Sequence, residues 1–98
     1  MRVLSHSTLI DYYNKDIKAK AALEHWYQTV KRAEWTCFAD IKKDFNTVDS
    51  VGNQRYVFDI KGNDYRLVVI VRFSIKTIFI RFVGTHKEYD NIKDIKSI

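Results

Sequence analysis

Proline is absent from the 98 residues of this sequence, and glycine and cysteine are scarce, with three and one respectively. No Gly/Ser-rich linker or low-complexity tract separates domains, so we expect one domain over residues 1–98. Gly62 and Gly84 stand alone, which excludes a phosphate-cradling glycine-rich loop. The single Cys37 excludes an internal disulfide and is typical of a reducing cytoplasm. Aromatic residues lie close to it in the sequence, so we expect a buried small hydrophobe rather than a nucleophile.

Long apolar runs are also missing. The longest, Leu67–Val71, is far shorter than the roughly 20 residues that a membrane-spanning helix needs. Residues 1–6 contain no pattern of a secretion signal. No pair of cysteines or histidines has the spacing of metal ligands, and the carboxylates do not cluster in a way that suits magnesium. We therefore expect a cytoplasmic protein without membrane contact, metal or cofactor.

The composition is that of a folded, basic domain. Apolar residues make up 46% and charged residues 30%, which is too apolar for a disordered chain and too charged for a membrane span. Lysine and arginine outnumber the acidic residues by 17 to 12, which gives a net charge of +5. Such a charge attracts polyanions whatever their sequence, with an affinity that falls as salt rises. It becomes informative only if the positive side chains share one face.

The first half of the chain has helical periodicity after a short strand at Arg2–Leu4. Ser7 or Thr8 can cap a short helix, which residues 14–16 interrupt. A long amphipathic helix is expected over residues 17–33. Its buried stripe consists of Ala19, Leu23, Trp26, Val30 and Ala33.

A third helix and a set of strands are expected in the rest of the chain. Thr36 should cap the helix, whose buried side carries Phe38, Ile41, Phe45 and Val48. Alternation of apolar and polar residues then predicts strands. The expected elements are a loop at 49–53, strands at 55–60, 65–73 and 78–83 joined by a hairpin at 61–64 and a turn at 74–77, and a short helix over 87–95.

Pairing these strands through their turns, with Ile60 opposite Tyr65 and Phe73 opposite Ile78, separates their side chains into two faces. One face is apolar and should bury the helices: Tyr56, Phe58, Ile60, Tyr65, Leu67, Val69, Val71, Phe73, Ile78, Ile80 and Phe82. The other mixes all four arginines of the sheet with apolar residues: Arg55, Val57, Asp59, Arg66, Val68, Ile70, Arg72, Phe79, Arg81 and Val83.

The second face allows two interpretations. Its arginines can simply solvate the outside of the sheet, with Asp59 paired across strands to Arg66. Alternatively, arginines mixed with apolar residues can form a covered or concave surface that stacks bases and grips phosphates. We favour the second interpretation because a solvated face rarely carries so many apolar residues.

The segment Gly84–Asp90 places an imidazole, an ammonium and a phenol within one turn, directly after the last strand. Histidine titrates near neutrality, so His86 suits a general acid or base in RNA cleavage. A forked guanidinium can hold the scissile phosphate. The catalytic candidates are His86, Arg66, Tyr89 and Lys87, and the candidates for RNA binding are Arg81, Lys61, Asn63, Arg55 and Arg72. Plainer roles stay open, with His86 as a surface or capping residue and Tyr89 as part of the core.

Three stretches of the second half resemble the HigB toxins of bacterial type II toxin–antitoxin systems: Tyr56–Ile60, Gly62–Leu67 and Arg81–Asp90. The combination of the last two, at nearly fixed separation, is the specific part of the resemblance. The N-terminal segment also fits, with Trp35 before Ala39–Lys42. The resemblance therefore covers most of the chain.

The resemblance implies an α+β fold of the RelE/ParE superfamily. This fold is a twisted antiparallel sheet, formed by a short N-terminal strand and a three-strand meander, with helices packed on one face and a short C-terminal helix. It also implies an mRNA interferase that acts on mRNA in the ribosomal A site. A small helix-turn-helix antitoxin would neutralise it, and operator DNA would be bound only through the antitoxin complex.

By position, the resemblance matches Arg66 to the family's strand arginine, and His86, Lys87 and Tyr89 to its C-terminal motif. It does not fix which residue is the base and which the acid. Two other functions stay open: a ParE-like toxin that inhibits gyrase, and a non-catalytic basic module that binds nucleic acid.

Overall fold

The computed structural model describes residues 1–98, and its centre is a five-stranded sheet. The strand order is β1-β5-β4-β3-β2, with β1 parallel to β5 and every other pair antiparallel. The strands are β1 (Arg2–Leu4), β2 (Asp49–Gly52), β3 (Arg55–Ile60), β4 (Tyr65–Arg72) and β5 (Thr77–Thr85). The helices are α1 (His6–Lys15), α2 (Lys20–Arg32), α3 (Phe38–Asp44) and α4 (His86–Asp90), with short 3₁₀ turns at Ile17–Ala19, Phe73–Ile75 and Ile95–Ser97.

This architecture confirms the expected α+β class and the meander β3-β4-β5. Two details differ from the expectation. The sheet is mixed, because β1 joins it parallel to β5, and it has a fifth strand where residues 49–53 were expected to form a loop. β2 is an edge strand whose first residues are exposed, so it lacks the apolar alternation that reveals a half-buried strand.

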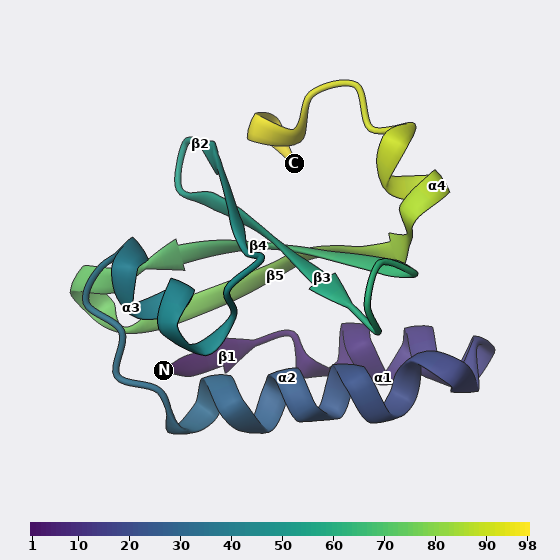
Figure 1. Ribbon diagram of the computed structural model, residues 1–98, viewed down its shortest axis with the longest axis horizontal. Helices are drawn as coiled ribbons and strands as arrows, with labels where there is room; N and C mark the ends of the chain where they lie inside the picture. The colour runs from purple at the N-terminus through teal and green to yellow at the C-terminus, as the bar shows by residue number, and fades with distance from the viewer.

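The helices α1 and α2 pack along one side of the sheet (Figure 1). α2 has this position because its apolar residues recur with the helical period, and Leu23, Trp26 and Val30 are completely buried. They join the inner residues of β3, β4 and β5 in one hydrophobic core of 18 buried residues. Trp26 contacts Phe58 edge to face, with ring centres 5.4 Å apart. The predicted buried stripe of this helix is thus confirmed.

A β-bulge in β5 changes which of its residues face the helices. The pairing with β4 skips Arg81, so that Val68 lies opposite Phe82. One extra residue inverts the alternation of side chains beyond it. Val83 therefore packs against the helix core, and Phe82 lies on the opposite side with Val68. The prediction of Phe82 on the helix face and Val83 on the other was wrong for this reason.

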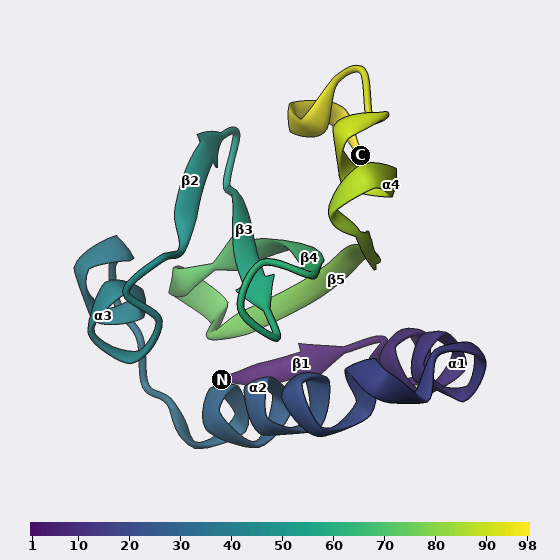
Figure 2. The same cartoon turned by 45° about the vertical axis from the view of Figure 1, so that its right-hand side comes forward.

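The other side of the sheet is covered by the chain's own C-terminal part. α4 and the segment after it lie on the side opposite α1 and α2 (Figures 1 and 2). Beneath them Val57, Val68 and Ile70 are no more than 9% exposed. The centre of this face therefore cannot stack bases, and that part of the sequence interpretation was wrong. The face is covered rather than concave.

Some local expectations also fail. Cys37 is exposed, because it is the N-cap residue of α3 and its side chain stays outside the core. Thr36 does not cap that helix, but its backbone N–H and hydroxyl both donate to Asp40 at 2.8 and 2.9 Å. These bonds lower the pKa of the Asp40 carboxyl. None of the helices combines the length and apolar character needed to cross a membrane.

Candidate active site

The helix α4 follows β5 directly, and its first turn is capped by Thr85, the last residue of the strand. Thr85 accepts a hydrogen bond from the backbone N–H of Glu88 at 3.1 Å, and its own N–H donates to the Glu88 carboxylate at 2.8 Å. This capping box fixes the first turn of α4. The backbone N–H of His86 donates to the carbonyl of Asp64, 3.1 Å away in the β3–β4 hairpin. The start of α4 is therefore tied to the hairpin that precedes Arg66.

Arg66 is held rigidly between β3 and α4. Its side chain is 12% exposed, and one terminal nitrogen lies 3.2 Å from the carboxylate of Asp59 on the neighbouring strand. The other donates to the side-chain oxygen of Asn63 at 2.7 Å. The cross-strand pair of Asp59 and Arg66 is as expected from the sequence. The Nε–H of Arg66 makes no hydrogen bond within the protein, so the guanidinium keeps a donor for a phosphate oxygen.

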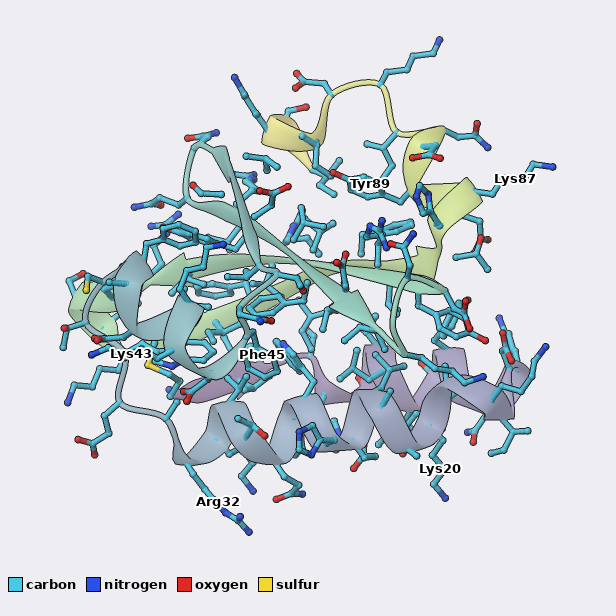
Figure 3. The ribbon with its side chains drawn as sticks, viewed as in Figure 1. Lys20, Arg32, Lys43, Phe45, Lys87 and Tyr89 are labelled. Atoms are coloured by element: carbon cyan, nitrogen blue, oxygen red, sulfur yellow. The ribbon has the colours of Figure 1, made fainter.

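Tyr89 lies on the inner side of α4, and Lys87 points away from the molecule (Figure 3). The ring of Tyr89 is 5.9 Å from the guanidinium carbon of Arg66, within the range of a cation–π contact. Burial is the largest influence on the Tyr89 phenol and raises its pKa. The charge of Arg66 lowers the pKa, and nearby carboxylates, of which Asp49 has the largest effect, raise it. The net shift of the pKa is upward. The phenol is protonated at neutral pH, as an ordinary tyrosine is, and the upward shift keeps it so; it can therefore act as a proton donor.

His86 forms a contact with a carboxylate that the sequence reading did not anticipate. Its Nδ1 lies 2.9 Å from the carboxylate of Asp90, four residues further along α4. A carboxylate at this distance favours the proton of the neutral ring on Nδ1, and in that tautomer Nε2 is the proton acceptor. Both side chains are partly exposed, at 42% and 58%. The signal that could have found Asp90 is its spacing from His86, since residues four apart meet on a helix.

Gly84 allows α4 to lie close to Arg66. It pairs with Arg66 across the strands and is buried. A Cβ at this position would lie 2.7 Å from Cζ of Phe82 and 2.9 Å from a carboxylate oxygen of Glu88. Any side chain there would push against the residue that completes the capping box. The glycine is required by this close approach rather than by its backbone angles.

The predicted site residues fall into two groups. Asn63, Arg66, His86 and Tyr89 lie around the junction of the β3–β4 hairpin with α4. Lys61 and Lys87 are exposed at the rim of this group, with Lys61 3.8 Å from Asp64.

The other three arginines lie elsewhere. Arg72 is at the far end of β4, about 20 Å from Arg66 at roughly 3.3 Å per residue. Arg81 is the exposed extra residue of the bulge. The guanidinium of Arg55 donates to the main-chain oxygen of Ile98. The four arginines of the sheet therefore do not converge on one phosphate.

No other feature of the structure competes with this cluster. A shallow cavity of about 300 Å³ lies between α2 and α3, lined by Thr29, Arg32, Ala33 and Asp44, and contains no predicted site residue. No group of three or more histidine, cysteine, aspartate or glutamate side chains is arranged to hold a metal ion. The cluster at the junction of β4, β5 and α4 is the candidate active site.

A helix-backed meander that ends in such a cluster matches the class expected from the sequence, the RelE-like toxins. Comparison with known families supports this class, because residues 19–92 match the HigB toxin family, described as the RelE-like toxic component of a toxin–antitoxin system. The chain therefore belongs to the HigB toxin family.

Individual relatives agree. An mRNA interferase toxin HigB of Escherichia coli K12 is 30% identical over 92 residues, which cover 92% of this chain and 88% of that protein. An mRNA interferase HigB of E. coli O6:H1 is 24% identical over 94 residues, covering 94% of this chain and 91% of that one. A third relative, from Shigella flexneri, is also named mRNA interferase HigB and is 30% identical over 92 residues.

Proposed function

We propose that the protein is an mRNA interferase, an endoribonuclease that cuts messages in the ribosomal A site without a metal ion. The observation that carries the proposal is the group formed by Arg66, His86 and Tyr89, which combines an anion-binding guanidinium, a proton acceptor and a proton donor at one end of the sheet. The relatives named mRNA interferases support the same activity.

The reaction uses the 2′-hydroxyl of the RNA as the nucleophile. Nε2 of His86 takes the 2′-hydroxyl proton as the bond from O2′ to phosphorus forms. Tyr89, whose phenol is protonated at neutral pH, gives its proton to the leaving 5′-oxygen as the bond from phosphorus to O5′ breaks. The products are a 2′,3′-cyclic phosphate and a 5′-hydroxyl. The proton held by His86 returns to the tyrosinate through solvent after product release.

Arg66 stabilises the negative charge that develops on phosphorus. Its guanidinium is fixed by Asp59 and Asn63, so little reorganisation is needed when the phosphate arrives. Lys61 and Lys87 add positive charge at the rim, where they attract the RNA backbone. Arg81 and Arg72 are exposed and form no ion pair, and both lie beyond Arg66 towards the far end of β4, so we assign them to contacts with RNA on that side of the cleaved bond.

The family is the toxic component of a two-component system, so an antitoxin partner follows from it. We propose a small helix-turn-helix antitoxin that binds this toxin, with operator DNA contacted only through the complex. The net charge of +5 favours an acidic contact surface on this partner.

Induction of the protein in cells, followed by mapping of RNA 5′ ends, tests the proposed activity. Wild-type protein should arrest growth and produce new 5′-hydroxyl ends in ribosome-bound messages. His86→Ala and Arg66→Ala should abolish both effects, and Arg32→Ala, an exposed charge outside the cluster, should not. Full toxicity of both site variants would contradict the proposal. A DNA-damage response without new RNA ends would contradict it too and would indicate gyrase inhibition.

A further inference from the structure

The C-terminal segment, residues 91–98, returns over the sheet from α4 to the β2–β3 turn (Figures 1 and 2). Its three isoleucines are half-buried, and the apolar side chains on this side of the sheet, Val57, Val68 and Ile70, are buried. The segment thus forms the second apolar cover of the sheet. α4 connects the end of β5 to this cover (Figure 1).

The β2–β3 turn holds the end of this segment through its polar groups. Arg55 donates from Nη2 and Nε to the main-chain oxygen of Ile98, at 2.6 and 3.2 Å. The side-chain amide of Asn53 donates to the carbonyl of Lys96 at 2.9 Å. Gly52 leaves room for the Lys96 side chain, whose Cε would lie 3.2 Å from a Cβ at position 52. We call the two donors, Asn53 and Arg55, the latch.

We propose that the latch positions Tyr89 against Arg66, so that Arg55 is a positioning residue rather than a group that binds RNA. α4 has five residues, and so short a helix has little stability of its own. Its start is fixed by the capping box and by the bond between His86 and Asp64. Its other end continues into the segment that the latch holds.

The hydrogen bonds of Arg55 support this assignment. All three of its guanidinium nitrogens donate to main-chain oxygens, with Nη1 bonded to the carbonyl of Asn53 at 3.0 Å. The Nε of Arg66, in contrast, has no partner, and neither Arg72 nor Arg81 forms a hydrogen bond or ion pair. Among the four arginines of this face, Arg55 is therefore the one whose three guanidinium nitrogens all donate within the protein.

Hydrogen exchange of the free protein tests the latch directly. In Arg55→Ala, amide exchange over residues 86–98 should rise by about tenfold or more, because two bonds to a charged donor are lost. Asn53→Gly removes the second donor and keeps a residue suited to the positive φ of 52°, so it provides a variant with little risk of misfolding. Arg72→Ala, on the same face but without partners, should leave this exchange unchanged. Arg55→Lys, with a single ammonium donor, should restore part of the protection.

The position of Tyr89 needs a second readout. In Arg55→Ala the ring should become more solvated, and the pKa of Tyr89, raised by burial, should fall towards its ordinary value in NMR titration of labelled tyrosine. Faster exchange together with this fall supports the proposal. Unchanged exchange would overturn it, as would faster exchange with an unshifted Tyr89. A loss of RNA affinity with exchange unaltered would show that Arg55 binds RNA directly.

The consequence for catalysis rests on the proposed function. A released α4 should lower RNA cleavage through the turnover step, since Tyr89 leaves the scissile bond while Arg66 remains to bind. The exchange and titration experiments need no RNA. They therefore test the latch even if the cleavage experiment on the wild-type protein fails.

Discussion

The guanidinium carbon of Arg66 lies 5.9 Å from the ring centre of Tyr89, and this contact joins β4 to α4. It connects the proposed phosphate-binding group to the proposed proton donor. Burial of Tyr89 and the charge of Arg66 act in opposite directions on the phenol, and burial is the larger. The pair therefore packs α4 against β4 and also couples the charge of Arg66 to the pKa of Tyr89.

Removal of the Arg66 charge should raise the pKa of Tyr89 further. Arg66→Ala deletes the cation that favours the tyrosinate and leaves the carboxylate of Asp59 without its partner. Titration of labelled tyrosine by NMR measures the change, with Arg32→Ala as a control for total charge. A Tyr89 titration that stays in place or moves to lower pH would show that the two groups are not coupled.

His86 and Asp90 should differ in their importance for cleavage. His86→Ala should reduce the rate by about a hundredfold or more, because the general base is lost. Asp90→Asn should reduce it by about fivefold or less, since the contact between the two side chains is partly exposed. Single-turnover cleavage of programmed ribosomes measures both. Equal losses in the two variants would mean that Asp90 has a direct role in the chemistry.

Tyr65 ties the sheet to the corner between α1 and α2 in a way that depends on pH. Its hydroxyl donates to Asp16 at 2.6 Å, and this bond is the main cause that raises the pKa of Tyr65 from 10.0 to about 12. A raised pKa stabilises the folded state fully below pH 10, and that contribution is lost as pH rises from 10 to about 12.

Tyr65→Phe should therefore lower stability at neutral pH and remove this part of the alkaline loss. Urea unfolding at a series of pH values measures both effects. Tyr27→Phe is the matched control, because the Tyr27 hydroxyl has no hydrogen-bond partner within the protein. An identical pH dependence in wild-type protein and Tyr65→Phe would contradict the assignment.

Gly84→Ala should disturb the start of α4. The added methyl group would lie 2.7 Å from the Phe82 ring and 2.9 Å from Glu88, so at least one of them must move. We expect a loss of about 1–3 kcal/mol in unfolding free energy, as for an overpacked core, and a larger relative loss of cleavage. Gly62→Asn is a suitable control, since nothing lies within 4 Å and asparagine tolerates its positive φ. Full activity of Gly84→Ala would mean that α4 can shift without harm.

The parts of the fold that the sequence predicted are those with a strong hydrophobic period. The stripe of α2 and the alternation in β3 and β4 identify their buried sides without reference to the rest of the chain. β2 was missed because an exposed edge strand has no buried side to produce a pattern. The bulge at Arg81 was missed because it depends on pairing with β4, which alternation within β5 does not report.

The sequence predicted the contacts of the candidate site that form between neighbouring elements, but not the contact that Arg55 makes with the end of the chain. Arg66 and the His86–Tyr89 segment meet because β4 pairs with β5 and α4 follows β5 directly. Both connections can be predicted from patterns between residues that are close in the sequence. The place of Arg55 depends on where the last residues of the chain return. Nothing near Arg55 in the sequence indicates that contact.

The parallel pairing of β1 with β5 sets the order in which this fold can be completed. Arg2 pairs with Thr77, so the first strand has no neighbour in the sheet until residues 77–79 have been synthesised. The proposed acid and base come later still, on α4. On the proposed mechanism, a nascent chain that has not yet reached α4 lacks both groups and cannot cut RNA, which leaves time for an antitoxin to bind as the activity first appears.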